Sequence, residues 1–440
     1  MSFTDEQPFL DAIFARYHDD GPRLVYADFL DDSGEPERAE LVRVQLSLTH
    51  LGEHHPRRPE LAERQAELIT NHSPKWKEHL QHLVADIEFR RGILDSVTVD
   101  AGGFLEHGSE LFGLARVRRI RLLGVTGHLE KLIDSPMLLN IRELDLCGED
   151  LGNAGLHLLA RSPFLGNLDS LDVGFNGLDD NGLAAVARAS TLVNLTHLAL
   201  NDNSQITSRG VGSLANSPFF AGLTSLDLSG NDIDSDGVRV LTSGKLLPRL
   251  HTLPLKGNPI GDEGIVYLTQ SPLLPRMLAR SHRLELRDNS IGPEGAALLA
   301  KCPALQRCTT LDLTRNQISE RGFAALLSSS NLANVHTLKL GGNLITDAGI
   351  TAVRALLPKW LDRLRVLELS DNRLTRHGIG ALHAARGESG VVLDVSGNVQ
   401  SAGSDVPVPV GEVMPGVLRG VEEAAELRRR IAHPRSLPNK

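Results

Sequence analysis

The sequence predicts an α/β solenoid, a horseshoe with parallel strands on the concave face and helices outside, joined to a small N-terminal all-helical domain. The frame L-x-x-L-x-L-x-x-N-x-I/L-x-x-x-G recurs many times, and an apolar segment with helical spacing follows each glycine. Because the L-x-L core alternates with period two, each copy predicts a short strand with one buried face, followed by a helix. Strand and helix in strict alternation give parallel strands in a curved array.

The asparagine of the frame marks each copy, as Asn231 does in LTSLDLSGNDIDSDG. From Asn176 to Asn372 the asparagines recur with a period of roughly 27 to 31 residues, and the longest step is the one from Asn258 to Asn289. A side-chain amide can satisfy backbone groups where a strand ends, so we predict a structural asparagine ladder. Its members are Asn176, Asn203, Asn231, Asn258, Asn289, Asn316, Asn343, Asn372 and Asn398.

Three weaker copies complete the series. Glu149 takes the asparagine position in IRELDLCGEDLGNAG, and LDSVTV around Val97 and VRRIRL around Ile120 are degenerate copies. We therefore expect about twelve repeats over residues 86–400. One copy cannot fold alone, because about five buried aliphatic side chains at roughly 1.5–3 kcal/mol each do not offset a backbone ordering cost of roughly 1–2 kcal/mol per residue.

This frame resembles the leucine-rich repeat. A period of roughly 27 to 29 residues with a glycine after the loop is similar to the ribonuclease-inhibitor class of that repeat. The resemblance covers roughly residues 90–400, where nine or more copies are in register.

Residues 1–85 lack the repeat and predict a helical domain that caps the first copy. Segments such as PFLDAIFARY and PELAERQAELI have apolar positions at helical spacing, with Pro or Gly between segments. The stretch Phe9 to Gln45 resembles the bacterial repeat-companion domain, most specifically in PRLVYADFL (Pro22 to Leu30) and GEPERAELVRVQ (Gly34 to Gln45). That family more often has tryptophan where Phe29 stands. The resemblance implies a bacterial origin and no reaction.

The C-terminal segments predict a linker and a second cap. Residues 401–414 contain SAGSDVPVPVG, which is typical of an extended linker. Residues 415–440 predict an amphipathic helix and a basic tail that cover the last repeat. Alternatively, the basic cluster in this tail binds an acidic surface; its members are Arg428, Arg429, Arg430 and Arg435.

Composition excludes several classes of protein. A net charge of −9 and a pI near 6.0 argue against nucleic-acid binding, which needs a basic surface. Three scattered cysteines are too few for a disulfide framework and favour a reducing compartment. The N-terminus has acidic residues where a secretory signal is basic, and no apolar run is long enough to span a membrane. We expect a cytoplasmic monomer that binds neither nucleic acid nor membrane.

The sequence predicts no enzyme, cofactor or metal site. It contains no phosphate-binding glycine loop and no nucleophile elbow. Asp232, Asp234 and Asp236 followed by Gly237 are similar to the start of a calcium loop, but Ser243 stands where that loop needs a bidentate acid. His72, His79 and His82 lack further ligands at metal-binding spacing.

The residue between the two leucines of each L-x-L points to the concave face. Along the chain this position is occupied by Thr98, Arg121, Asp145, Asp172, Ala199, Asp227, Pro254, Glu285, Asp312, Lys339, Glu368 and Asp394. Seven of these residues are acidic, and twelve strands would form a surface roughly 55–60 Å long. The seven carboxylates are predicted to bind a basic protein face, or alternatively only to keep an exposed sheet soluble.

These features predict a non-enzymatic interaction scaffold that binds a protein through its concave face. One alternative is a regulator of a small GTPase, because leucine-rich GTPase activators share this repeat length; they typically end in an acidic tail, whereas this chain ends in LRRRIAHPRSLPNK. A second alternative is an inhibitor of a basic enzyme, similar to ribonuclease inhibitor, although that class is rich in cysteine and aromatic contacts.

Overall fold

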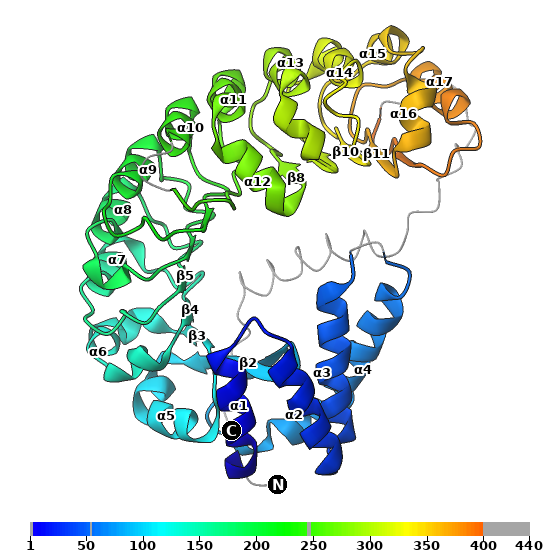
Figure 1. Cartoon of the computed structure of the whole chain (residues 1–440). Coiled ribbons are helices and arrows are strands. Elements are labelled where there is room, and N and C mark those ends of the chain that lie inside the picture. Colours follow the sequence, from blue (N-terminus) through cyan, green and yellow to red (C-terminus); the bar gives the residue numbers. More distant parts are fainter. Residues whose placement is uncertain (1–2, 53–54, 244–247, 399–440) are drawn as a thin grey trace, which may run out of the picture.

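The computed structural model describes residues 3–52, 55–243 and 248–398. These residues form an open arc with strands along its inner side and helices along its outer side (Figure 1). The predicted fold class, an α/β solenoid with parallel strands on its inner side and an N-terminal helical region, is confirmed. The predicted linker at 401–414 and helix and tail at 415–440 lie outside the described residues.

The strands of the arc belong to two sheets rather than one. The first has the order β1 to β7 and the second the order β8 to β12, and every pair except β1–β2 is parallel. The strands are β1 (Asp86–Arg90), β2 (Ile93–Asp100), β3 (Arg119–Leu123), β4 (Glu143–Asp145), β5 (Ser170–Asp172), β6 (His197–Ala199), β7 (Ser225–Asp227), β8 (Arg283–Glu285), β9 (Thr310–Asp312), β10 (Thr337–Lys339), β11 (Val366–Glu368) and β12 (Val392–Asp394). Between β7 and β8, the copy that contains Pro254 has no strand among its described residues, although it is bonded to β7 and forms an isolated bridge from Thr252 to Ser225.

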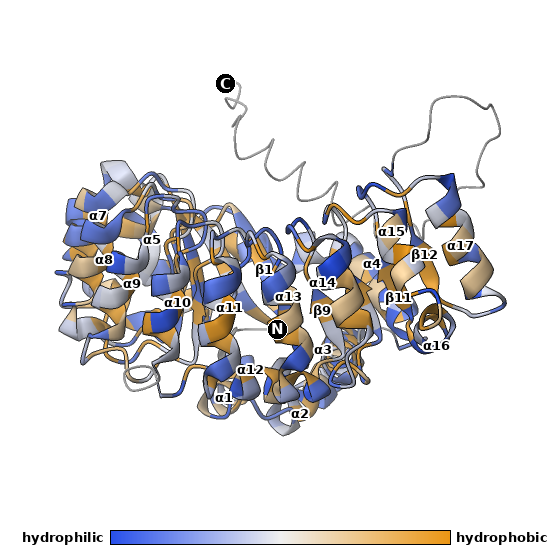
Figure 2. Ribbon diagram, turned by 90° about the horizontal axis from the view of Figure 1, so that it is seen from above, coloured by the Kyte–Doolittle hydropathy of each residue, from blue (hydrophilic) through white to orange (hydrophobic). Residues whose placement is uncertain are grey.

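Helices follow the strands of both sheets, and most of them lie on the outer side of the arc (Figure 1). They are α5 (Ala101–Leu114), α6 (Leu129–Ile133), α7 (Gly152–Leu159), α8 (Asp180–Val186), α9 (Ser208–Ala215), α10 (Ser235–Thr242), α11 (Gly261–Gln270), α12 (Leu273–Ser281), α13 (Pro293–Lys301), α14 (Ser319–Leu327), α15 (Asp347–Ala352), α16 (Leu357–Arg363) and α17 (Arg376–Arg386). Hydrophilic and hydrophobic stretches alternate along them, as expected of amphipathic helices that cover a sheet (Figure 2).

One hydrophobic core runs between the strands and the helices from Leu80 to Val391. The leucines on both sides of each concave position lie in it; Leu226 and Leu228 are fully buried. The glycine of the frame lets the helix approach the preceding loop, because a Cβ on Gly264 would lie 2.1 Å from the Cγ2 atom of Ile260. The frame thus encodes both the buried strand and the close packing of the helix.

The predicted asparagines connect successive copies through their side chains. Asn203 is typical: its Nδ2 donates to the carbonyl of Val173 in the preceding copy, and its Oδ1 accepts from the backbone N–H groups of Asn176 and Leu178. In the copy without asparagine, the Glu149 carboxylate accepts from the N–H of Val125 at 3.1 Å. These bonds satisfy buried backbone groups just beyond the strands, where the sheet ladder ends.

The described part of the N-terminal module consists mainly of α-helices and is bonded directly to the solenoid. The helices are α1 (Phe3–Ala15), α2 (Gly21–Asp32), α3 (Pro36–His50) and α4 (Arg58–Trp76). The Gln45 amide donates to the carbonyl of Phe89 at 2.9 Å and accepts from the N–H of Gly92 at 2.6 Å, so α3 holds the β1–β2 hairpin. This antiparallel hairpin was not predicted, and it joins the module to the first sheet.

Two motifs of the N-terminal module meet in a buried polar network. Arg38 donates to both oxygens of Glu6, at 2.8 and 2.9 Å, and the Tyr26 hydroxyl donates to Glu6 at 2.6 Å. Tyr26 comes from PRLVYADFL and Arg38 from GEPERAELVRVQ. The two motifs on which the family resemblance rests therefore supply Tyr26 and Arg38, which hold α2 and α3 to Glu6 of α1.

Candidate functional site

The predicted concave residues lie in register on neighbouring strands. In the first sheet Arg121 pairs with Asp145, Asp145 with Asp172, and Asp172 with Ala199. Ala199 pairs with Asp227 in turn. In the second sheet, Glu285 begins an equivalent line that ends at Asp394. The structure brings the carboxylates together in two rows, one on each sheet.

Five of the predicted aspartates also have a structural role at the end of their strand. In each, Oδ1 accepts the backbone N–H of the residue two positions later, as Asp227 does from Ser229 at 2.9 Å. Such a bond closes a local turn and explains why aspartate recurs at this position. The other members are Asp145, Asp172, Asp312 and Asp394. One carboxylate oxygen is thereby occupied, and the second is left for other contacts.

Asp145 is removed from the predicted partner-binding residues. It is only 4% exposed, and Arg119 from the preceding strand donates to it at 2.7 Å. A second arginine, Arg121, lies 3.8 Å away. The charge of Asp145 is thus neutralised inside the protein, so a partner would have to displace an existing ion pair in order to bind it.

Asp172 and Asp227 flank the small side chain of Ala199 and form a shallow basin. The basin has a volume of about 230 Å³ and is also lined by Glu143 and His197. Neither Asp172 nor Asp227 makes an ion pair with another residue of the described ranges. Burial, together with the charges of Asp145 and Asp227, raises the pKa of Asp172. Arg119 also lines the basin and opposes this rise, but it is bonded to Asp145, so a cationic group would still be attracted by the two carboxylates that have no ion pair.

The concave row of the second sheet is also acidic but contains one cation. Lys339 lies in register between Asp312 and Glu368. Burial raises the pKa of Glu368, and the charges of Asp312 and Asp394 add to that effect while Lys339 opposes it. Glu285, at the start of this row, is exposed.

A second row of concave residues was missed by the sequence reasoning. It lies two positions before the first row, where period two places side chains on the same face, and it includes Arg119, Glu143 and His197. Arg118, next to this row, donates to Glu143 at 3.0 Å and to Asp169 at 2.5 Å. The period-two alternation of each strand could have identified this row, because a residue two positions before a concave residue lies on the same face.

Tyr17 connects the N-terminal module to this end of the concave face. Its ring lies between the guanidinium groups of Arg23 and Arg118, 4.8 and 4.4 Å from its centroid. Its hydroxyl donates to Asp95 at 2.7 Å, and Asp95 is 1% exposed. Burial raises the pKa of both Tyr17 and Asp95, so their hydrogen bond lies in a poorly solvated contact.

The aspartates that are similar to a calcium loop act within the fold. Asp234 caps α10 by accepting from the N–H of Gly237 at 3.2 Å and from the Ser208 hydroxyl, while Asp236 pairs with Arg239 at 2.8 Å. Among the described residues, no three His, Cys, Asp or Glu side chains are grouped as a metal site would require. No helix in the same ranges is long and apolar enough to cross a membrane.

The family model of the leucine-rich repeat matches this chain at residues 167–187, 191–215, 223–241, 248–268 and 282–300. No curated protein matches the sequence. Among solved structures, an internalin from Listeria monocytogenes str. 4b F2365 is similar to the chain at 19% identity and a TM-score of 0.36. That likeness covers 63% of this chain and 88% of the internalin chain. Each of the five matched segments contains one asparagine of the ladder, and four of them contain a strand, so this part of the chain is built of leucine-rich repeats.

Proposed function

We propose that this protein is a non-enzymatic scaffold whose concave face binds a basic segment of another protein, with the basin around Ala199 as the central contact. Solenoids, including those of the leucine-rich repeat matched here, use extended concave surfaces for binding. The observation that carries the proposal is that Asp172 and Asp227, in register on both sides of Ala199, lack a cationic partner within the described chain. A lysine or arginine of the partner would supply the missing charge.

The experiment is a pull-down with the full chain and two matched neutralised variants. Asp172→Asn with Asp227→Asn removes two charges but keeps the oxygen that accepts the turn N–H. Glu130→Gln with Asp134→Asn removes two exposed charges near α6, on the convex side. We expect the wild-type chain and the convex variant to recover the same protein, and the concave variant to recover about tenfold less, a loss of about 1.4 kcal/mol. Equal recovery by all three would refute the basin as the binding site.

A third variant tests the N-terminal module as the site. Leu24 and Val25 on α2 are 46% and 57% exposed. Loss of recovery with Leu24→Ser and Val25→Ser, but not with the concave variant, would move the contact to this module. If the recovered protein is a GTPase whose hydrolysis the wild-type chain stimulates, the regulator alternative replaces the scaffold.

The cellular setting is part of the proposal. We propose a cytoplasmic protein, supported by three free cysteines, of which Cys302 and Cys308 are buried. The assignment of residues 1–85 to the bacterial repeat-companion domain likewise stays a prediction, supported by the motif residues Tyr26, Arg38 and Gln45 in the interior contacts of the module.

A further inference from the structure

We infer that the solenoid has a hinge between the copy of Asn258 and the copy of Asn289, at which the two sheets rotate relative to each other. This inference goes beyond the proposed function and is testable without a partner. The first sheet ends at β7 with a single bridge to Thr252, and β8 begins a separate sheet. The break coincides with the longest step in the repeat, the one from Asn258 to Asn289.

The backbone ladder is incomplete at this junction. At regular junctions the second leucine of each strand donates to the next copy, as Leu228 does to Pro254 at 3.1 Å and Leu286 to Asp312 at 2.8 Å. The equivalent N–H of Leu255 makes no such bond to Glu285 within the described ranges. The N–H groups of Gly257 and Gly261 still donate across, to Arg287 and Asn289, and the N–H of Gly292 donates back to the Asp262 carboxylate. The two copies thus keep their hydrogen bonds in the loops that follow the strands, but they lack the hydrogen bonds between the strands themselves.

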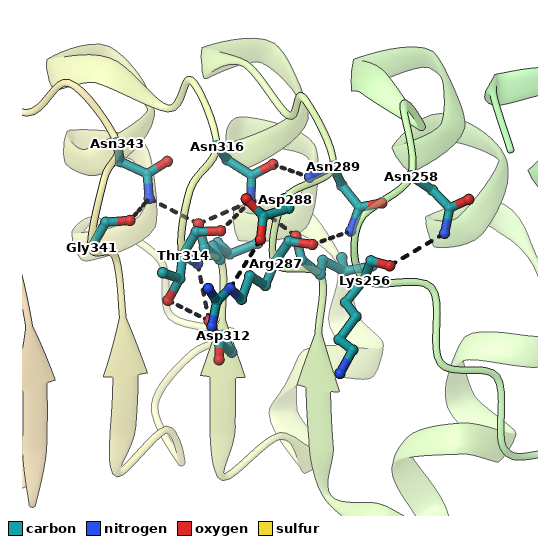
Figure 3. Close-up of polar contacts among 12 residues, drawn as sticks. Lys256, Asn258, Arg287, Asp288, Asn289, Asp312, Thr314, Asn316, Gly341 and Asn343 are labelled. Carbon is teal, nitrogen blue, oxygen red and sulfur yellow. Dashed lines mark hydrogen bonds and ion pairs between the residues drawn. The ribbon is translucent and has the colours of Figure 1, made fainter. Parts of the chain in front are cut away.

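The asparagine ladder has a fault at the same place. Asn289 is fully buried, but its Oδ1 accepts no hydrogen bond from the part of the chain described, and its Nδ2 donates only to Arg287 within its own copy. Asn316, one copy later, again accepts from Asn289 and donates to Leu286. Figure 3 shows this contrast: Asn316 is joined to Asn289, whereas no bond joins Asn289 to Asn258.

The extra length of this copy accompanies the fault. Pro254 weakens the same copy on its other side, because its carbonyl accepts from Leu228 and its missing N–H therefore faces β7. The longer copy contains α12, which follows α11 almost directly and runs into β8 through His282 in a left-handed conformation with φ of 53°. Both outer residues of β8 are exposed, whereas those of β7 and β9 are partly buried. The concave side chains of β8 are therefore more exposed than those of β7 and β9.

The hydrophobic core crosses the junction without a break, through residues such as Leu255, Ile260, Leu273 and Leu284. Apolar contacts are non-directional and tolerate a small rotation, whereas hydrogen bonds depend steeply on angle. A junction that keeps its core and its bonds beyond the strands, but lacks the bonds along them, bends without unfolding. Rotation there changes the distance between the acidic rows of the two sheets, and thus the width of the concave groove.

Spin-label distances test the hinge in the full chain with Cys147→Ser. One pair of cysteines at exposed positions, Arg239 and Arg321, spans the junction between α10 and α14. Two control pairs span the same number of copies within one half: Lys131 with Arg209, and Lys301 with His383. We expect a clearly broader distance distribution for the junction pair than for both controls. Equal widths for all three pairs would overturn the inference.

Hydrogen exchange provides a second test that needs no substitution. The N–H groups of Gly230, Gly257 and Gly342 occupy the same position in their copies and donate to the next copy at 2.8, 2.9 and 2.9 Å. If the junction opens, Gly257 exchanges about tenfold or more faster than the other two. Equal protection of the three glycines would count against the hinge, because their hydrogen bonds are alike in length.

Discussion

The first sheet and the second sheet are built from one repeat, yet they differ in the directional contacts added to it. In the first, Arg118–Asp169 and Arg119–Asp145 cross between strands in partly buried positions. In the second, the ion pairs between described residues, Arg287–Asp288 and Arg321–Glu294, are exposed. Exposed pairs contribute little to stability.

The two ends of the first sheet show the same contrast. Its start is covered by the N-terminal module through Gln45, Tyr17 and the β1–β2 hairpin. Its other end is followed by the copy of Asn258, which does not complete the ladder to β8. The difference shows that the repeat frame provides strand, core and helix, whereas the strength of each junction depends on contacts that vary from copy to copy.

The largest expected effect on stability comes from the asparagine ladder, where Asn231 at a regular junction is compared with Asn289 at the incomplete one. Asn231 donates to Leu200 and Leu228 at 3.0 and 2.9 Å and accepts from Asn203 at 3.2 Å, so Asn231→Ala leaves several buried backbone groups unpaired. We expect a loss of about 3–5 kcal/mol in the free energy of unfolding. Asn289→Ala removes one bond within its own copy and should cost about 1–2 kcal/mol.

Urea denaturation of both variants checks this difference, with Asn216→Ala on the exposed end of α9 as a control for asparagine substitution. Equal losses for Asn231→Ala and Asn289→Ala would contradict the difference between regular and faulty junctions. The asparagines would then stabilise each copy locally rather than tie it to its neighbours.

A smaller effect is expected where the N-terminal module meets the first sheet. Gly92 has φ of 84°, and a Cβ there would lie 2.3 Å from the Cα of Val42 in α3. Gly92→Ala should cost about 3 kcal/mol, since backbone atoms cannot yield as a side chain does. Gly34 has φ of 79° but open space around it, so Gly34→Ala should cost only about 1 kcal/mol.

The two tryptophans report where that loss occurs. Trp76 packs edge-on against Phe89 of β1, with ring centroids 5.4 Å apart, and Trp360 lies in the second half, donating to Leu327. In single-tryptophan variants, Gly92→Ala should lower the unfolding midpoint seen by Trp76 more than that seen by Trp360. A uniform shift at both probes would show that the halves unfold as one unit.

Most of the fold could be predicted because each copy repeats the same burial. The frame places Leu226, Leu228 and Asn231, and their counterparts in other copies, in the interior. The strands, the ladder and the line of concave residues therefore follow from the alternation within each strand and from the regular spacing of the copies. The β1–β2 hairpin could not be predicted in this way, because it occurs once and is held by Gln45 from another helix.

The candidate site was predictable in position but not in charge state. Period two places Asp145 and Asp172 on the same face, but nothing in either copy shows that Arg119 of another strand neutralises Asp145. The break between the sheets was also visible only as the long step from Asn258 to Asn289 and as Pro254. Whether an insertion bulges outward or separates two strands depends on packing between copies, and the repeat pattern does not describe that packing.

The smallest expected effect is a pH dependence that distinguishes the concave carboxylates from those that cap helices. Burial raises the pKa of Asp172 above its unfolded value, so the stability it contributes is present below about pH 4 and is lost as pH rises through the folded pKa. Asp172→Asn keeps the hydrogen bond from the N–H of Gly174. Its stability should therefore rise relative to that of the wild-type chain as the pH rises towards neutrality. Glu368→Gln should behave likewise in the second sheet, since burial also raises the pKa of Glu368.

Asp234 provides the control of opposite sign. Its hydrogen bond from Ser208 lowers its pKa, so the stability it contributes is present above the unfolded pKa and is lost as pH falls. Asp234→Asn should therefore weaken the protein at neutral pH, and the difference from wild type should vanish in acid. Thermal unfolding of the three variants between about pH 3 and 8 measures both trends. If Asp172→Asn and Asp234→Asn followed the same trend, the fold would stabilise the ionised form of Asp172 as it does that of Asp234. The proposal that the basin around Ala199 contains uncompensated carboxylates would then be wrong.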